Sequence, residues 1–342
     1  MPTVDEILTT AIHHGATDVH MLVGRPVMYR IQGDLVATDD HVISPDDARV
    51  ICYSMLADDQ IRELEDNLDY DFIAGRDQHR FRVNMSFNQG TLGAVIRVLN
   101  HRPMPLSAIG LPPVVEELAQ RDKGLVLVTG TTSQGKTTTL AAIIDHINEY
   151  RNKHIITIED PVEYLHENKQ SIIRQREIGK DTKTFNAGLR AALRQDPDVI
   201  VIGEMRDFES IQIALMAAES GVLVLSTLHT MSIDKVLERL LSYVPPAQEG
   251  QIRLMLSESL LGVIHQELLP TVTGGKRVAC EILTNSNAVR NTIRNRETYH
   301  LQSYILTSER THGMRSMKRS LDELLSAGDI TQELYDQILL NY

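Results

Sequence analysis

The chain has 342 residues, enough for two or three domains, and its 42% hydrophobic and 23% charged residues are typical of a globular protein. Its net charge of −12 argues against nucleic acid as the main partner. No apolar run approaches the roughly 20 residues of a transmembrane helix, and Met1–Thr10 lacks a signal-peptide pattern, so we expect a cytoplasmic protein. Cys52 and Cys280 fit no metal-binding or disulfide pattern and are predicted to be buried thiols.

Residues 1–100 are predicted to form a small α+β domain with 8 arginines, no lysine and 16 acidic residues, a net charge of −8. The apolar pattern predicts a helix, two short strands, a helical stretch capped by Ser44 and an antiparallel strand pair, at Val4–His14, Asp18–Val23, Val27–Ile31, Pro45–Asn67, Arg80–Phe87 and Gly93–Leu99. Two closely spaced prolines, Pro103 and Pro105, then indicate a linker over residues 101–110.

From residue 111 onward, buried strands alternate with helices. Strands are predicted at Leu125–Thr129, His154–Glu159, Val199–Ile202 and Val222–Thr227, and helices at Lys136–Arg151, Phe185–Arg194 and Phe208–Glu219, with a polar loop after Glu159. This alternation predicts an α/β domain over residues 111–284, with a mainly parallel sheet covered on both faces. Residues 285–342 are predicted to be helical and to end in Leu321–Ala327 and Thr331–Leu340.

The segment between the first of these strands and its helix matches the phosphate-binding pattern G-x-x-x-x-G-K-[ST] at every fixed position. It consists of Gly130, Thr131, Thr132, Ser133, Gln134, Gly135, Lys136 and Thr137. The two glycines let successive N–H groups point at phosphate oxygens, and the N-terminus of the following helix adds positive potential. Lys136 is predicted to reach the β- and γ-phosphates and Thr137 to hold Mg²⁺. The segment therefore predicts a nucleoside-triphosphate site.

Hydrolysis also needs acidic partners, and three other strand ends supply polar side chains. The strand His154–Glu159 runs into an acidic turn, in which Glu159, Asp160 and Glu163 are predicted to lie beside the nucleotide. The strand Val199–Ile202 ends in Gly203 and Glu204, which resembles a Walker B element, so Glu204 is predicted to hold Mg²⁺ or its water. Asp198, at the far end of that strand, is predicted to be a cap.

His229 follows the fourth strand. A lone histidine would usually be structural, but three polar strand ends that converge on one site favour a functional role here.

These motifs, in their order, resemble those of the secretion-ATPase superfamily, and specifically its type IV pilus retraction ATPases, the PilT-like branch. The family's Walker A, Asp box, atypical Walker B and His box correspond to Gly130–Thr137, Ile156–Tyr164, Asp198–Asp207 and roughly Gly221–Thr230. Ala16–His20 and Arg80–Asn84 resemble the family's PAS-like N-terminal domain, so the resemblance covers nearly the whole chain. It implies a RecA-like P-loop domain and an ATP hydrolase motor for pilus retraction and twitching motility.

The resemblance also implies roles and partners. Glu163 is implied to be the catalytic base, with Glu204 arranging Mg²⁺ and water, and Arg82 and Arg97 are implied to act on the γ-phosphate as fingers or sensors. Without the resemblance, either arginine would more often form a cross-strand salt bridge. The implied assembly is a homohexameric ring at the cytoplasmic face of the inner membrane. It would use ATP and Mg²⁺ and act with a membrane-embedded pilus platform protein.

Two segments depart from the family pattern. Ala288–Asn295 resembles the retraction-linked motif A-I-R-N-L-I-R-E but has Val289, Thr292 and Asn295 at three of its positions. In the phosphate-binding segment, Thr131, Ser133 and Gln134 replace the family's usual Pro, Gly and Ser.

Four alternatives stay open. A pilus-assembly or type II secretion ATPase would usually carry a four-cysteine zinc motif, which the two cysteines cannot form. A conjugation or type IV secretion ATPase of the DotB-like kind shares the core motifs. A non-enzymatic regulator is opposed by Lys136, Thr137, Glu163 and Glu204, and a helicase or recombinase is opposed by the acidic charge.

Overall fold

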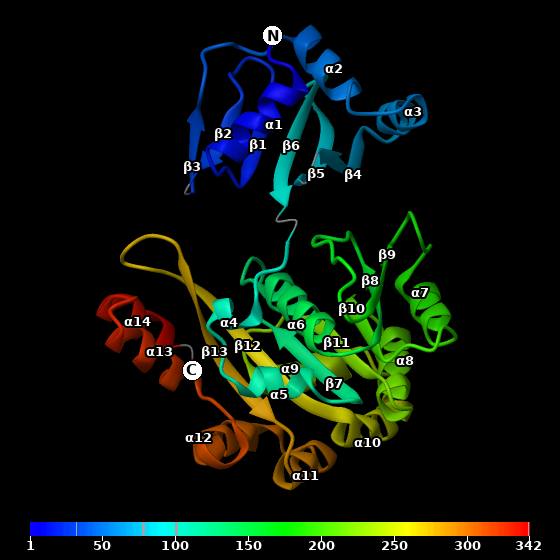
Figure 1. Cartoon of the computed structure of the whole chain (residues 1–342), viewed down its shortest axis with the longest axis vertical. Coiled ribbons are helices and arrows are strands. Elements are labelled where there is room, and N and C mark those ends of the chain that lie inside the picture. Colours follow the sequence, from blue (N-terminus) through cyan, green and yellow to red (C-terminus); the bar gives the residue numbers. More distant parts are fainter. Residues whose placement is uncertain (32, 77–78, 100–101, 341) are drawn as a thin grey trace. The chain divides into compact units, whose positions relative to one another are not determined.

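The computed structural model describes residues 1–342 except 32, 77–78, 100–101 and 341. The chain divides into two compact units, Met1–Arg102 and Pro103–Tyr342 (Figure 1). The predicted linker at 101–110 begins outside the described residues. Its later part contains the short helix α4 (Leu106–Ile109), whose Leu106 is buried in the core of the second unit. This part of the predicted linker therefore folds onto the second unit.

In its described residues, the first unit is a six-stranded sheet with three helices. Its strands lie in the order β3-β2-β1-β6-β5-β4, and every neighbouring pair is antiparallel. Alternate residues of β5, Phe81, Val83 and Met85, pack into a core with apolar side chains of the helices. The elements are α1 (Val4–His13), β1 (Asp18–Met21), β2 (Met28–Ile31), β3 (Asp34–Ala37), α2 (Pro45–Tyr53), α3 (Asp58–Asn67), β4 (Asp69–Arg76), β5 (His79–Asn88) and β6 (Thr91–Leu99).

The predicted antiparallel pair of the first unit is confirmed as β5 and β6. The predicted single helical stretch Pro45–Asn67 is wrong, because it forms two helices, α2 and α3. Ser44 caps α2 as predicted. A second helix starts because the side-chain oxygen of Gln60 accepts a hydrogen bond from the N–H of Ala57, 2.9 Å away, at a new N-cap. The sequence analysis also missed β3, which is exposed along its length, and β4.

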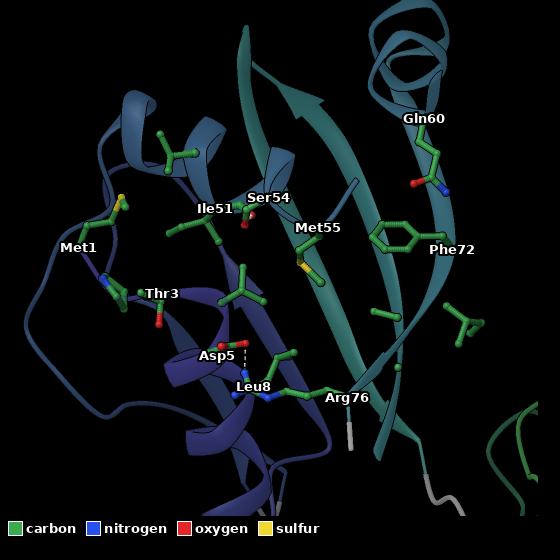
Figure 2. A pocket seen from close by; sticks show the side chains of 16 residues that line it. Met1, Thr3, Asp5, Leu8, Ile51, Ser54, Met55, Gln60, Phe72 and Arg76 are labelled. Carbon is green, nitrogen blue, oxygen red and sulfur yellow. Dashed lines mark hydrogen bonds and ion pairs between the residues drawn. The ribbon is translucent and has the colours of Figure 1, made fainter. Parts of the chain in front are cut away.

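A cavity of about 660 Å³ in the first unit is lined by residues of α1, α2, α3 and β4 (Figure 2). Its walls combine apolar side chains, among them Leu8, Ile51 and Phe72, with polar ones, and the Asp5–Arg76 ion pair lies at its side. None of the residues predicted for nucleotide chemistry is among the described residues that line it. The nucleotide site therefore has to be sought in another part of the structure.

The second unit is a three-layer α/β fold. Its seven strands lie in the order β13-β12-β7-β11-β10-β8-β9, and all neighbours are parallel except the antiparallel pair β12 and β13. Alternate residues of the central strand β7 enter opposite layers: Leu125 and Leu127 pack with the layer of α8–α10, and Val126 and Val128 with the layer of α5 and α6. The predicted α/β fold, with a mainly parallel sheet covered on both faces, is confirmed.

The strands and helices predicted for this unit are present to within a few residues. The sequence analysis missed four helices, α4, α5, α9 and α10. It also missed the polar edge strand β9, which lies in the predicted polar loop, and the hairpin of β12 and β13. Residues 285–342 are mainly helical, as predicted. Besides α4, the elements are α5 (Val114–Ala119), β7 (Gly124–Thr129), α6 (Lys136–Tyr150), β8 (His154–Glu159), β9 (Ile172–Glu177), α7 (Phe185–Ala192), β10 (Val199–Glu204), α8 (Phe208–Glu219), β11 (Leu223–Leu228), α9 (Ile233–Ser242), η1 (Pro246–Gln248), α10 (Glu249–Ser259), β12 (Leu260–Pro270), β13 (Lys276–Thr284), α11 (Asn287–Asn295), η2 (Thr298–His300), α12 (Leu301–His312), α13 (Met317–Ser326) and α14 (Gln332–Leu339).

Two further expectations can be compared with the structure. Cys52 and Cys280 are free and buried, as predicted, and burial raises the pKa of the Cys52 thiol to about 12 and that of the Cys280 thiol to about 11. Such thiols stay protonated and unreactive. Among the described residues, no helix is both long enough and apolar enough to cross a membrane.

The start of β7 gives a test of how tightly the central strand is packed. Gly124 has a φ of +119°, and a Cβ there would lie 2.5 Å from Cγ of Leu261 and 2.9 Å from the carbonyl oxygen of Ser259. Gly124→Ala should therefore lower the free energy of unfolding by at least about 2 kcal/mol in chemical denaturation. Gly250→Ala in α10 is the matched control, because nothing lies within 4 Å of the added Cβ. A similar loss in both variants would contradict this packing.

Candidate active site

Four neighbouring parallel strands of the second unit end at one edge of the sheet. Their order is β7-β11-β10-β8. The segment Gly130–Thr137, called the phosphate loop from here on, follows β7, His229 follows β11, Glu204 ends β10 and the acidic turn Glu159–Glu163 follows β8. Because parallel strands bring their carboxyl ends together, the structure places these predicted segments along one sheet edge.

The backbone of the phosphate loop has the shape that anion binding needs. Gly130, Ser133 and Gly135 have φ angles of +150°, +64° and +79°, and helix α6 begins directly after Gly135. Such a succession of turns lets consecutive N–H groups converge on phosphate oxygens at a helix N-terminus. A Cβ on Gly130 would lie 2.6 Å from the carbonyl oxygen of Gln266 in β12, so only glycine fits there. The loop therefore has the backbone geometry expected of a phosphate cradle and packs against β12.

Gln134 fastens this loop to β12. Its side-chain Oε1 accepts a hydrogen bond from the N–H of Leu268 at 2.5 Å, and its carbonyl oxygen accepts one from Nε2 of Gln266 at 2.6 Å. The sequence analysis placed Gln134 in the phosphate-binding segment and noted its departure from the family pattern, but did not predict its contacts with β12. Its role depends on a strand more than a hundred residues away, and no local signal in the sequence could have shown it.

Lys136 is the buried cation of the site, with 7% of the residue exposed. Its Nζ donates a hydrogen bond to the carbonyl oxygen of Thr131 at 2.6 Å and lies 3.3 Å from Nδ1 of His229. Burial lowers the pKa of the Lys136 ammonium, and the charges of Glu204 and Glu163 oppose that shift. Both carboxylates therefore lie close enough to act on the lysine.

His229 connects this lysine to the end of β10. Because an ammonium group can only donate, Nδ1 of His229 accepts from Lys136 and the ring proton is on Nε2, 3.6 Å from Oε2 of Glu204. Burial and the charge of Lys136 lower the pKa of the His229 imidazole, which keeps the ring neutral at pH 7. The predicted residues Lys136, His229 and Glu204 thus form one connected group.

A bulge at the end of β10 sets the position of Glu204. The pairing of β10 with β11 shifts register between Ile202 and Glu204, and Oγ1 of Thr227 donates to the carbonyl oxygen of Gly203 at 2.6 Å. The carboxylate also accepts a hydrogen bond from Nε of Arg206 at 2.8 Å. The sequence analysis missed Arg206, although its position two residues after a strand-ending glutamate was a usable signal.

Glu163 lies in a turn that is anchored on both sides of it. The N–H of Val162 donates to Oε2 of Glu177 at 3.2 Å, and the hydroxyls of Tyr164 and Thr138 lie 2.8 Å apart, which ties the turn to α6. Val162 and Tyr164 are buried, while Glu163 itself is half-buried. The turn therefore presents Glu163 toward the charge of Lys136 on a fixed backbone.

The remaining acidic residues have less direct positions. The carboxylate of Glu159 accepts hydrogen bonds from Oγ1 of Thr157 at 2.6 Å and from Nε2 of Gln175 at 3.2 Å, and Asp160 is exposed, next to a cis peptide bond to proline. Asp198 accepts from the N–H of His154 at 2.9 Å at the opposite end of β10, the capping role that the sequence predicts.

The donor set at this edge suits Mg²⁺ bound together with a nucleotide. The described residues contain no group of three His, Cys, Asp or Glu side chains that could hold a metal alone. Magnesium sites in nucleotide enzymes use one or two protein oxygens and complete the shell with phosphate and water. Thr137, half-buried in the first turn of α6, and Glu204 supply oxygens of this kind.

Arg82 and Arg97 belong to the first unit, where they lie directly opposite each other on β5 and β6. Arg82 forms an ion pair with Asp71 at 3.6 Å, and Nε of Arg97 donates to Asp18 at 2.9 Å. These are the cross-strand pairs that the sequence would suggest without any family resemblance. Their side chains are 44% and 63% exposed, so both guanidinium groups stay accessible, and the predicted role on a γ-phosphate stays a prediction.

Ser133 offers a direct test of the loop backbone. Its φ of +64° is unfavourable for a residue with a Cβ, and the family usually has glycine there. Ser133→Gly should raise the free energy of unfolding by about 0.5–1 kcal/mol, since relief of strain outweighs the added entropy of the unfolded chain. Ser242→Gly at the end of helix α9 is the control and should be destabilising. Destabilisation by Ser133→Gly of equal size would contradict the left-handed geometry.

Comparison with known proteins agrees with this geometry. The family model described as type II/IV secretion system protein matches residues 1–337. The chain is 39% identical over 334 residues to the type IV pilus retraction ATPase PilT of Pseudomonas aeruginosa, covering 96% of each chain.

Two solved structures are also similar. The crystal structure of the pilus retraction motor PilT with bound ADP superimposes with a TM-score of 0.90 at 40% identity, covering 99% of this chain and 97% of that one. The ATPase DotB of Legionella pneumophila gives a TM-score of 0.86 at 26% identity, covering 99% of this chain and 95% of that one. The chain therefore belongs to the type II/IV secretion system protein family, as its ordered motifs predict.

Proposed function

We propose that this protein is an ATP-hydrolysing motor that retracts a type IV pilus. The observation that carries the proposal is the connected group at the sheet edge. In it the ammonium of Lys136 contacts the imidazole of His229, and that imidazole contacts the carboxylate of Glu204. A phosphate cradle alone binds nucleotide. A cradle joined to carboxylates can also orient water and respond to the γ-phosphate.

Each residue has a role in this proposal. Amides of the phosphate loop and Lys136 bind the β- and γ-phosphates, and Thr137 and Glu204 hold Mg²⁺, which neutralises charge on the phosphates when bound. Glu163 is the general base, since it is half-buried in a turn that is anchored on both sides and lies close enough to Lys136 for its charge to act on that ammonium. His229 contacts both Lys136 and Glu204 and so couples the position of the lysine to that of the carboxylate. Glu159 and Asp160 line the same edge.

The motor is proposed to work as a ring. Six copies would form a closed ring at the cytoplasmic face of the inner membrane, acting on a membrane-embedded pilus platform protein. Arg82 and Arg97 would reach the γ-phosphate from the first unit, exchanging Asp71 and Asp18 for a phosphate partner. Closure and reopening around ATP would then move the platform.

The three changed positions of the retraction motif in α11 are compatible with this role once their surroundings are considered. Val289 and Thr292 are buried, so these two departures from the family pattern change packing inside the unit. Arg294 keeps polar partners on α10, with Nε donating to Oγ of Ser257 at 3.0 Å and an ion pair to Glu258. Asn295 alone is an exposed change. The higher identity to PilT than to DotB also favours retraction over the secretion alternative.

The base assignment is tested by Glu163→Gln. If Glu163 orients and deprotonates water, the variant should lose at least about 100-fold in kcat for ATP while its affinity for ADP stays within about twofold. Phosphate release and fluorescent-nucleotide binding measure the two quantities. Glu167→Gln, four residues further along and exposed, is the control that should keep normal turnover. Near-normal turnover in Glu163→Gln would rule out the assignment.

The direction of movement is tested in the source bacterium. Deletion of the gene should leave cells with more surface pili and without twitching, because filaments would be built but not withdrawn. Wild-type protein should restore twitching and Lys136→Ala should not. Electron microscopy of pili and a surface-motility assay give the two readouts. Unpiliated cells would indicate extension instead, and normal pili with loss of a transferred substrate would favour a secretion ATPase.

A further inference from the structure

A chain of hydrogen bonds, buried at Thr129 and His265 and half-buried at Glu267 and Tyr342, links the strand before the phosphate loop to Tyr342. It consists of Thr129, His265, Tyr342 and Glu267, and we call it the tyrosine relay. Oγ1 of Thr129 lies 3.1 Å from Nδ1 of His265, and Nε2 of His265 lies 2.6 Å from the phenol oxygen of Tyr342. That phenol donates to Oε1 of Glu267 at 2.8 Å. We propose that Tyr342 is a positioning residue for the phosphate loop, which sets nucleotide affinity through the relay.

The direction of every hydrogen bond in the relay follows from its carboxylate end. Glu267 can only accept, so the Tyr342 hydroxyl gives its proton to Glu267 and must accept from Nε2–H of His265. Nδ1 of His265 then lacks a proton and accepts from the hydroxyl of Thr129. The relay therefore has a single arrangement, and loss of the phenol leaves His265 with a buried, unpaired N–H.

Burial makes the relay sensitive to such a loss. Thr129 is 0% and His265 1% exposed, so water cannot readily replace a missing partner. Burial lowers the pKa of His265 to about 4, which keeps the ring neutral, and burial together with Glu267 raises the pKa of the Tyr342 phenol. The His265 ring and the Tyr342 phenol are therefore both neutral at pH 7.

The relay and the phosphate loop use the same stretch of β12. His265 and Glu267 alternate with Gln266, so the relay holds one face of the strand and the loop contacts the other. Gln266 bonds the carbonyl oxygen of Gln134, and its own carbonyl lies under Gly130. Thr129 directly precedes Gly130. A shift of β12 or of Thr129 would therefore displace the phosphate loop at Gly130 and at Gln134, both of which contact β12.

Tyr342 comes to this position through the C-terminal helices. It packs with apolar side chains of α13 and α14, of which α13 lies beside β13 and α14 packs against α13 (Figure 1). The same segment supplies a matched control residue. Tyr335 in α14 is also a largely buried tyrosine whose phenol donates to a carboxylate, Asp322 at 2.7 Å, but its hydrogen bond stays within the helices.

The test compares Tyr342→Phe with Tyr335→Phe in the intact protein, using ADP affinity and the steady-state kinetics of ATP hydrolysis. Tyr342→Phe should raise the Kd for ADP and the KM for ATP about 5- to 10-fold while kcat stays within about twofold. The reason is that the variant lacks the hydroxyl that bonds His265 and Glu267 and so holds β12 under the phosphate loop. Tyr335→Phe should leave all three quantities unchanged, although it should lower the thermal unfolding temperature by about as much as Tyr342→Phe does. Equal nucleotide affinities in the two variants would overturn the inference.

The opposite end of the relay provides a second test, which also covers the case in which Tyr342→Phe does not fold. Thr129→Val keeps the shape of the side chain, removes the hydroxyl and should raise the Kd for ADP by a similar factor. In the double variant the Kd should rise no further than in the more affected single variant, because both changes break one network. A Kd in the double variant that rises by the product of the two single effects, or an unchanged Kd in Thr129→Val, would overturn the proposal.

The inference goes beyond pilus retraction and rests only on nucleotide binding at the phosphate loop. Failure of the wild-type protein to bind ADP would contradict the proposed function itself. An unchanged Kd in Tyr342→Phe, with normal binding by the wild type, would contradict the relay alone.

Discussion

The close approach of the Gly130 backbone to β12 is the constraint on which the site depends. A side chain at this position would collide with the carbonyl oxygen of Gln266, and the two hydrogen bonds of Gln134 hold the loop on the same strand. Because α6 starts where the loop ends, the position of Lys136 follows from that contact. β12 is therefore as much a part of the proposed phosphate site as the loop whose motif predicts it.

The buried charge of Lys136 links the stability of this edge to its chemistry. An ammonium group taken out of water is costly unless acceptors and opposite charges surround it. Here Thr131, His229, Glu204 and Glu163 supply them from the loop, β11, β10 and the turn after β8. The parallel strand order brings these four sources together. A triphosphate with its metal would enter a site whose charges are already arranged around one lysine.

Features with a local signature could be predicted from the sequence. β7 and the loop after it, the polar ends of β8, β10 and β11, and the capping role of Asp198 all follow from periodicity, glycine spacing and strand ends. Contacts between distant residues could not be predicted. No motif encodes the pairing of β12 with β7 that brings Gln134 to Leu268, or the packing of the C-terminal helices that brings Tyr342 to His265. β9 and the break between α2 and α3 were missed because a polar edge strand and a side-chain cap leave the apolar pattern almost unchanged.

The central claim is that the sheet edge around Lys136 hydrolyses ATP. Phosphate release from ATP by the purified full chain, compared with Lys136→Ala, tests it most directly. The buried lysine should be required because it is the cation of the phosphate site, joined through His229 to Glu204. Turnover by the wild type and baseline release by the variant are the predicted result. Equal release by both, or none from a wild-type protein that binds nucleotide, would contradict it.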